Sequence, residues 1–215
     1  MVAKKVNSAK LKAFTLAEVL ITLGIIGVVA AITMPTLITN VQEKINITAL
    51  RTFYSTLTNA TEIIIAEYGE PSNWGLRDND RTSSKDTFEK YIEVMRVQKV
   101  CEENDSSCFP FPIYSYKNNN AVITSSQYEN WALRSFIMKN GTTVFIDVNN
   151  DCYSLFADVN GFKKPNKLGF DVFALMINKN GKIVSFDDET INGGNDNPEY
   201  NYAFNLINNN WKKDY

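Results

Sequence analysis

The feature that most constrains this sequence is an apolar run close to its N-terminus. No charged residue occurs between residues 19 and 37, and the run reaches about 25 residues when Phe14 and Ile38 are included. At about 1.5 Å of rise per residue, a helix of this length spans a hydrocarbon core of about 30 Å with some tilt. We therefore predict one transmembrane helix.

Basic residues precede this run, and none follows it immediately. The first 13 residues contain no acid and four lysines: Lys4, Lys5, Lys10 and Lys12. This asymmetry places the leader in the cytoplasm and everything beyond Thr39 across the membrane. A secretory signal peptide is the alternative, because it also joins basic residues to an apolar run. The apolar region of a signal peptide is only roughly 7–15 residues long, which is shorter than the run in this chain. In addition, no clear A-x-A cleavage site precedes Met34 and Pro35.

Glu18 is the single ionisable group inside this apolar stretch. A carboxylate at that depth costs about 2.5 kcal/mol or more unless it finds a partner, which makes Glu18 a functional candidate. The alternative is that its side chain reaches the lipid headgroups from the first turn of the helix.

Residues 12–21, with the sequence KAFTLAEVLI, resemble the type IV prepilin cleavage and methylation motif. The family includes the type II secretion pseudopilins. The resemblance implies that a prepilin peptidase cuts between Ala13 and Phe14 and methylates the new amine of Phe14. Glu18 is then the fifth residue of the mature chain, where the family keeps its glutamate. The family usually has glycine before the cut, and this chain has Ala13 instead.

The same resemblance implies how the chain assembles. Gly27 and Pro35 fall where pilins place the residues that bound a helix segment able to unwind in the filament. Glu18 would pair with the Phe14 amine of a neighbouring subunit, and such a pair favours one axial register because breaking it on one side is costly. The implied partners are prepilin peptidase, copies of the chain, other pilins or pseudopilins, and the assembly machinery of the inner membrane. The implied location is the inner membrane, single-pass with the head outside the cytoplasm, and then a periplasmic or extracellular filament.

The helical pattern resumes after Pro35 and continues to about Tyr68, where Gly69 and Pro71 end it. One apolar stripe recurs at steps of three and four residues: Leu50, Phe53, Leu57, Ala60 and Ile64. The predicted organisation is a leader at 1–13, a membrane or filament-core helix at 14–39, an amphipathic half at 40–70 and a globular head at 71–215.

The head is predicted to be α+β, with a meandering antiparallel sheet on the amphipathic half of the long helix, as in pilin-like heads. A short helix through Phe88 and Tyr91 follows the capping candidates Ser83 and Ser84. Strands are predicted at residues 132–138, 142–148, 153–159, 172–178 and 182–186. Hairpin turns are indicated by Asn-Gly pairs at 140–141 and 180–181. Apolar anchors are expected near the C-terminus at Phe204, Leu206, Ile207, Trp211 and Tyr215.

The three cysteines lack CxxC spacing, which argues against a zinc ribbon or a thioredoxin-type site. Cys101 and Cys108 flank a short polar stretch, and an exported domain meets oxidising conditions. We predict a disulfide between them. Cys152 is then a buried free thiol, with pairing to one of the other two as the alternative.

Two acidic stretches are weak candidates for calcium. Asp147, Asn149 and Asp151 alternate like the opening of a calcium loop and Asp158 stands where its closing acid belongs, but the region also alternates like a hairpin. Asp158, Asn160 and Asp171 flank a loop rich in Gly, Asn and Pro. A turn held by side-chain-to-backbone hydrogen bonds is the first expectation there, with calcium as the alternative. No other metal or cofactor is predicted.

The composition argues against several functions. The chain has no histidine and no nucleophile or phosphate-binding motif, so no enzymatic activity is predicted. The net charge is −2 and the sequence has no long basic block, so no nucleic-acid partner is predicted. The expected function is a structural subunit of a type IV pilus-like or type II secretion-like filament. The alternative is a membrane-tethered adhesin or binding protein with a pilin-like anchor.

Overall fold

The computed structural model describes residues 14–77, 80–103, 105–130, 134–149, 152–187 and 198–212. The predicted leader, with Ala13 at its end, lies outside these ranges. The chain divides into two compact units, Met1–Gln42 and Glu43–Tyr215, and one long helix passes from the first into the second. The second unit is called the head.

Helix α1 runs from Leu16 to Tyr68 and includes Pro35 in its interior. Its end agrees with the sequence prediction. Gly69 follows in the left-handed conformation, with φ of +77°, and its N–H donates to the carbonyl of Ile65 at 2.9 Å. Such a glycine supplies the backbone turn that ends a helix without steric cost. Pro71 then begins the short 3-10 helix η1, Pro71–Asn73.

The described part of the head contains one nine-stranded sheet and three further α-helices. The path through the sheet is β1-β4-β5-β6-β8-β7-β2-β3, and β9 also pairs with β8. The strands are β1 Val97–Val100, β2 Ile113–Ser115, β3 Ala121–Ile123, β4 Arg134–Met138, β5 Thr143–Asn149, β6 Cys152–Asp158, β7 Lys167–Leu168, β8 Val172–Asn178 and β9 Ile183–Val184. The helices are α2 Arg81–Val94, α3 Ser125–Asn130 and α4 Tyr202–Asn208, with a 3-10 turn η2 at Ser106–Cys108.

The two predicted Asn-Gly hairpins are confirmed. β4 pairs antiparallel with β5, and β8 pairs antiparallel with β9. Gly141 and Gly181 have φ of +89° and +74°. These angles are the reason that glycine suits the turns. The α+β class is therefore confirmed, with one correction: β7 lies parallel to both β2 and β8, so the sheet is mixed and not a purely antiparallel meander.

The predicted start of helix α2 needs a second correction. Asp80 is the N-cap residue, and its carboxylate accepts hydrogen bonds from the backbone N–H groups of Thr82 and Ser83. Ser83 and Ser84 are buried inside the first turn instead of capping it. Both residue types cap well, but Asp80 is placed to satisfy two free N–H groups at once.

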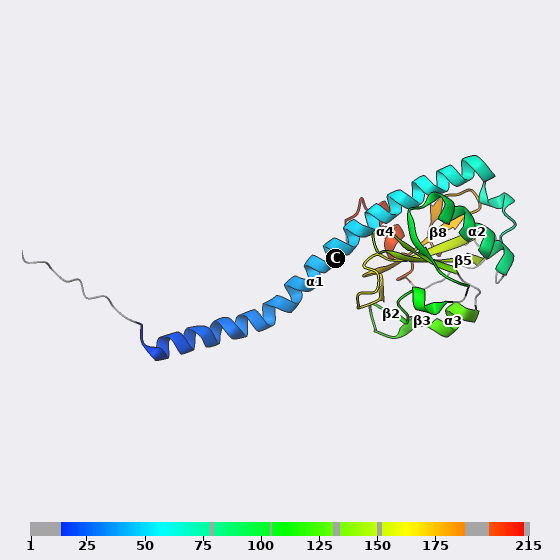
Figure 1. Ribbon diagram of the computed structural model, residues 1–215. Coiled ribbons are helices and arrows are strands. Elements are labelled where there is room, and N and C mark those ends of the chain that lie inside the picture. The colour runs from blue at the N-terminus through cyan, green and yellow to red at the C-terminus, as the bar shows by residue number, and fades with distance from the viewer. Residues whose placement is uncertain are drawn as a thin grey trace, which may run out of the picture. The chain divides into compact units, whose positions relative to one another are not determined.

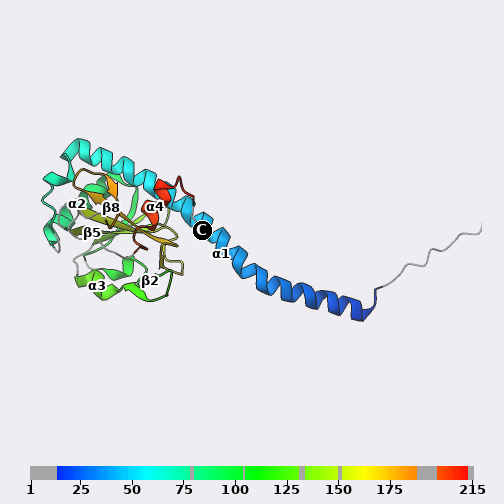
Figure 2. The ribbon, with the colours of Figure 1, turned by 180° about the vertical axis from the view of Figure 1, so that it is seen from behind.

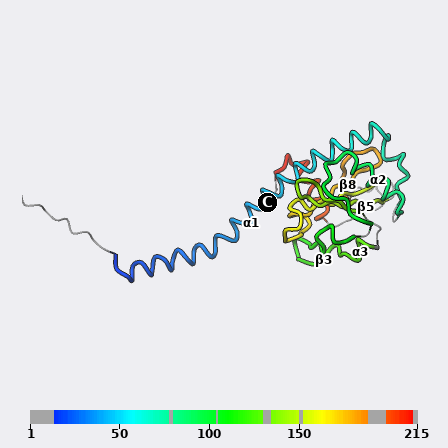
Figure 3. The backbone as a smooth tube through the Cα atoms, in the orientation of Figure 1, coloured from blue at the N-terminus to red at the C-terminus, as the bar shows by residue number. Residues whose placement is uncertain are grey.

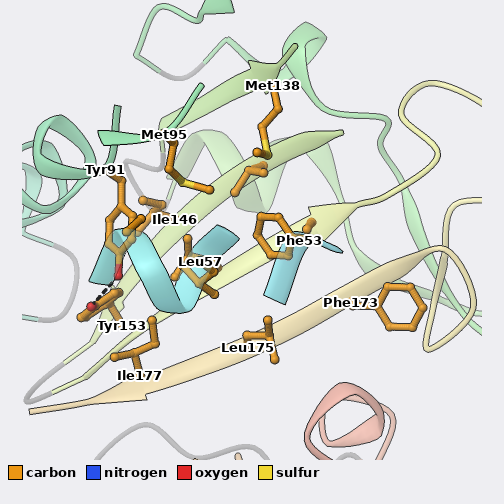
Figure 4. Packing of buried hydrophobic residues seen from close by; sticks show 14 of the residues in the cluster. Phe53, Leu57, Tyr91, Met95, Met138, Ile146, Tyr153, Phe173, Leu175 and Ile177 are labelled. Carbon is orange, nitrogen blue, oxygen red and sulfur yellow. Dashed lines mark hydrogen bonds between the residues drawn. The ribbon is translucent and has the colours of Figure 1, made fainter. Parts of the chain in front are cut away.

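One face of the sheet packs against α1, α2 and α4, and all five residues of the predicted stripe on α1 are buried there. Figure 4 shows Phe53 and Leu57 among side chains of the central strands, including Ile146, Leu175 and Ile177. The core on this face also contains a chain of hydroxyl groups. The Tyr91 hydroxyl lies 2.8 Å from the hydroxyl of Tyr153 and 2.7 Å from that of Thr61, and all three groups are buried.

The opposite face of the sheet carries a second core that is rich in aromatic side chains. Phe145 and Phe156 stack at 4.6 Å between ring centroids, and Phe109 meets Phe145 edge to face at 4.8 Å. Within the head, the second half of α1 and helix α3 lie on opposite sides of the sheet in both ribbon views (Figures 1 and 2). Because both faces are covered, every residue of β6 is buried.

The end of the described chain packs back onto the head part of α1, as the tube in Figure 3 traces. The ring of Trp211 meets that of Tyr54 at 5.5 Å, and Arg51 lies over Trp211 at 5.8 Å. Leu206 is buried in the core on the helix face. These contacts confirm the predicted anchoring of the C-terminal segment, although Tyr215 lies outside the described residues.

Candidate functional sites at the N-terminal segment and in an acidic loop

The first turn of α1 is closed by hydrogen bonds between Thr15 and Glu18. The Thr15 N–H and hydroxyl each donate to Glu18 Oε2 at 2.8 Å, and the Glu18 N–H donates to Thr15 Oγ1 at 3.2 Å. This reciprocal arrangement is a capping box. Residues 15–18 carry its sequence signature, Thr-x-x-Glu before an apolar run, so this cap is detectable from the sequence. Glu18 therefore has a structural role within its own chain.

The large apolar side chains that follow Glu18 in the predicted span are exposed in the described part of the chain. The 18-residue stretch of α1 that qualifies as a candidate membrane span has no buried residue. Phe14, just before α1, has 86% of its surface accessible. Exposed apolar residues continue through the predicted span: Leu16, Val19, Leu20, Ile21, Leu23, Ile25, Ile26, Val28, Val29, Ile32, Met34, Leu37 and Ile38. This stretch is long and apolar enough to cross a membrane once.

Gly27 and Pro35 both lie within continuous α-helix. A Cβ atom added at Gly27 would meet no atom within 4 Å, so nothing within the described chain requires glycine there. A glycine in a helix interior costs roughly 0.5–1 kcal/mol relative to alanine. Its presence in an exposed apolar helix is consistent with close approach by another helix.

The predicted disulfide between Cys101 and Cys108 is present, and Cys152, which is buried, is not part of it. The bridged loop is attached to strand β4 at its start, where the Cys101 N–H donates to the carbonyl of Ser135 at 3.1 Å. Asp105 caps the short turn inside the loop by accepting from Ser107, and these hydrogen bonds lower the pKa of its carboxyl. The loop is thus a braced structural element.

The two acidic stretches have different outcomes. Asp147 and Asn149 lie in strand β5, paired with Ser154 and Cys152 of β6, so the first stretch is a hairpin and not a calcium loop. Asp151 lies outside the described residues. Asp158 and Asp171 come together, because β6 ends at the first and β8 starts directly after the second. These two strands are antiparallel neighbours, and both carboxylates are fully buried.

The loop between them, residues 159–170, is folded around the two carboxylates. Asp158 Oδ1 accepts from the Asn160 N–H at 3.1 Å. Asp171 accepts from the N–H groups of Asn166 and Lys167 and from Asn160 Nδ2 at 2.9 Å. The predicted turn with side-chain-to-backbone hydrogen bonds is therefore confirmed.

Three buried oxygens of this loop are left over. Asp158 Oδ2, Asn160 Oδ1 and Asn166 Oδ1 have no hydrogen-bond partner within the described chain. Burial raises the pKa of Asp158 to about 9, with the nearby negative charge of Asp171 adding to the shift, and burial also raises the pKa of Asp171. A proton or a cation is needed to neutralise such a pair. Asp158, Asn160 and Asp171 were predicted here from the sequence, whereas Asn166 was not predicted as a possible ligand.

These oxygens fit the ligand preference of calcium, which binds carboxylate and amide oxygens. No group of three or more His, Cys, Asp or Glu side chains suited to a metal occurs in the described ranges, so any site here depends on the two asparagines.

Comparison with known proteins gives no match to a protein-family model, a curated protein or a solved structure.

Proposed function

We propose that this chain is a structural subunit of a type IV pilus-like or type II secretion-like filament, assembled through its N-terminal helix. The observation that carries the proposal is the exposed apolar stretch of α1, which has a single carboxylate, Glu18, in its first turn and directly follows a basic leader. The α+β head on the second half of the same helix agrees with that role. In a bilayer the apolar side chains contact lipid, and in a filament they contact the helices of other subunits.

In this proposal Glu18 has two tasks that use different oxygens. Both short hydrogen bonds from Thr15 go to Oε2, and Oε1 accepts none within the described residues. Removal of the leader between Ala13 and Phe14 creates a positively charged amine. Glu18 Oε1 of a neighbouring copy accepts a hydrogen bond from that amine. The pairing selects one axial register because an unpaired charge in the filament core is costly.

Leader processing tests the proposal directly. The full chain is co-expressed with a prepilin peptidase, and the intact mass of the membrane-bound product is measured. The expected product lacks residues 1–13 and carries a methylated Phe14 amine. Ala13→Gly is expected to be cut at least as completely as the original chain, and Ala13→Asp is expected to remain uncut. A product that keeps its leader, or that is cut near residue 35, would overturn the filament role.

We also propose that the loop between β6 and β8 holds a calcium ion. Asp158, Asn160, Asn166 and Asp171 would supply its oxygens, and the ion would neutralise the two buried carboxylates. Its role is structural: it ties the end of β6 to the start of β8. The three oxygens without partners support this second proposal.

The calcium proposal is tested by thermal unfolding of the full chain in detergent, with calcium and with a chelator. Calcium at a hundredfold excess over Kd adds about 2.7 kcal/mol to stability, which is measurable as a rise in Tm. Asp171→Asn is expected to abolish the rise, and Asp187→Asn, at an exposed position, is expected to retain it. Equal Tm values with calcium and with chelator would contradict the site.

A further inference from the structure

The tip of the loop between β6 and β8 presents an aromatic side chain flanked by two lysines. Phe162 has 54% of its surface accessible, and Lys163 and Lys164 beside it are also exposed. Neither lysine forms an ion pair with an acid in the described part of the chain. Phe162 is thus an apolar side chain with two available positive charges next to it. We define Phe162, Lys163 and Lys164 as the loop tip.

The loop tip is held in place by its base. Gly161 has φ of +70°, and a Cβ added there would lie 2.5 Å from the carbonyl oxygen of Gly141, so only glycine allows this close approach. At the other end, Asp171 fixes the backbone of Asn166 and Lys167 through hydrogen bonds. The exposure of Phe162 is therefore built into the loop, because the backbone on both sides is fixed.

The base of the loop packs against the point where α1 begins to belong to the head. Asn46 Nδ2 donates to the carbonyl of Phe170 at 3.0 Å. The Tyr202 hydroxyl donates to Glu43 Oε1 at 3.4 Å, and the Tyr202 side chain lies next to Gly169. Tyr202 therefore makes a second link between this part of α1 and the loop. Asn46 is seven residues after Thr39, the end of the predicted span. The base of the loop is therefore attached to α1 about two helical turns after the predicted end of the span.

A second basic and aromatic group lies beside the base of the loop. The ring of Tyr116 stacks on that of Phe170 at 5.7 Å, and Lys167 Nζ lies 6.0 Å from the Tyr116 ring centre. Tyr116 has 41% of its surface accessible. Aromatic side chains with lysines are typical of the zone where a protein meets lipid headgroups.

We propose that the loop tip binds the surface of an anionic phospholipid membrane, with Phe162 inserted among the headgroups and Lys163 and Lys164 contacting lipid phosphates. Each lysine near such a surface adds to the electrostatic attraction toward anionic lipid. The contact holds one end of the head against the bilayer while the chain is anchored, and it is lost when the chain leaves the bilayer. The inference rests on the membrane placement of α1 proposed above.

The test uses the full chain in vesicles, with an environment-sensitive fluorophore attached to a cysteine introduced by Phe162→Cys. Vesicles of phosphatidylcholine alone are compared with vesicles containing 30% phosphatidylglycerol, and quenching by spin-labelled lipid is measured. Two reference variants, Ile25→Cys in the apolar span and Lys99→Cys on the exposed strand β1, are labelled in the same way. Unsubstituted chain gives the background from Cys152.

We expect Ile25→Cys to be quenched in both vesicles, Phe162→Cys to be quenched only with phosphatidylglycerol, and Lys99→Cys to remain unquenched. Adding Lys163→Gln and Lys164→Gln should reduce quenching at position 162 at least twofold, while quenching at position 25 stays constant. The loop proposal is overturned if position 162 behaves like position 99 while position 25 is quenched, or if neutral lipid quenches it equally. Loss of quenching at both positions 25 and 162 overturns the membrane placement and the loop proposal together. A fluorescence response at position 162 to a single-stranded oligonucleotide, without one to anionic lipid, overturns it in favour of a nucleic-acid site.

Discussion

The Glu18 carboxylate accepts two hydrogen bonds from Thr15, both at 2.8 Å and both at the same oxygen. This arrangement separates two explanations for a glutamate in an apolar helix. A cap needs only an acceptor oxygen at this position, whereas pairing with the amine of a neighbouring subunit needs a negative charge. Glutamine keeps the acceptor and removes the charge.

We therefore predict that Glu18→Ala and Glu18→Gln both abolish incorporation into filaments while leaving membrane insertion intact. Thr15→Val removes one donor to Glu18 and is expected to reduce incorporation only in part, because a cap contributes about 1 kcal/mol. Incorporation is measured by shearing filaments from cells and quantifying the subunit, with membrane fractions as the control. Normal incorporation of Glu18→Gln would remove the proposed charge pairing and leave Glu18 as a cap alone.

The sequence predicted well those features that depend on neighbouring residues. The stripe from Leu50 to Ile64, the end of α1 at Tyr68 and the two Asn-Gly hairpins are set by helical spacing and by local turn chemistry. The disulfide also joins cysteines that are close in the sequence. For these elements the local signal and the tertiary structure agree.

Two of the missed features lie where the sequence has no periodic pattern. β7 has only two residues, Lys167 and Leu168, and it exists because β2 and β8 lie on either side of it. No periodic pattern can be detected over two residues. Asn166 is only five residues from Asp171, to which its N–H donates, and it was missed because residues of an irregular loop follow no periodic pattern. The choice of Ser83 over Asp80 as a cap shows a different limit, because several capping residues follow one another there.

The disulfide should stabilise the head by restricting the unfolded chain. Closing a loop of this size adds about 2.5 kcal/mol through the lost entropy of the unfolded chain. We predict that Cys101→Ser combined with Cys108→Ser lowers the free energy of unfolding by about that amount, measured by urea titration of the full chain in detergent. A reducing agent should lower the urea midpoint of the original chain and leave that of the double variant unchanged. An unchanged midpoint in the double variant would show that the bridge is not stabilising.

The head part of α1 should behave as core on one side and as surface on the other. Leu57 is fully buried, and Ile63 on the same helix is 52% exposed. We predict that Leu57→Ala destabilises the head by about 2–5 kcal/mol, through lost burial and the cavity left behind. Ile63→Ala is expected to cost about 0.5 kcal/mol. The free energies of unfolding of the two variants are compared with that of the original chain under identical conditions. Similar losses for both variants would contradict the assigned packing of α1.

The raised pKa of Asp158 predicts an unusual pH dependence of stability when no calcium is present. In the folded chain Asp158 keeps its proton up to a pKa of about 9, whereas in the unfolded chain an aspartate loses it near its ordinary value of 3.8. Between these values the folded state binds more protons, so stability falls as pH rises, by at most about 1.4 kcal/mol per pH unit. With a chelator, Asp158→Asn should remove most of this slope and raise the Tm at pH 8. With calcium the same variant should be less stable than the original chain, because it has lost a ligand. Tm measurements from pH 5 to 8, with calcium and with chelator, check whether the Tm difference between Asp158→Asn and the original chain changes sign. A difference of the same sign in both conditions would count against Asp158 as a calcium ligand.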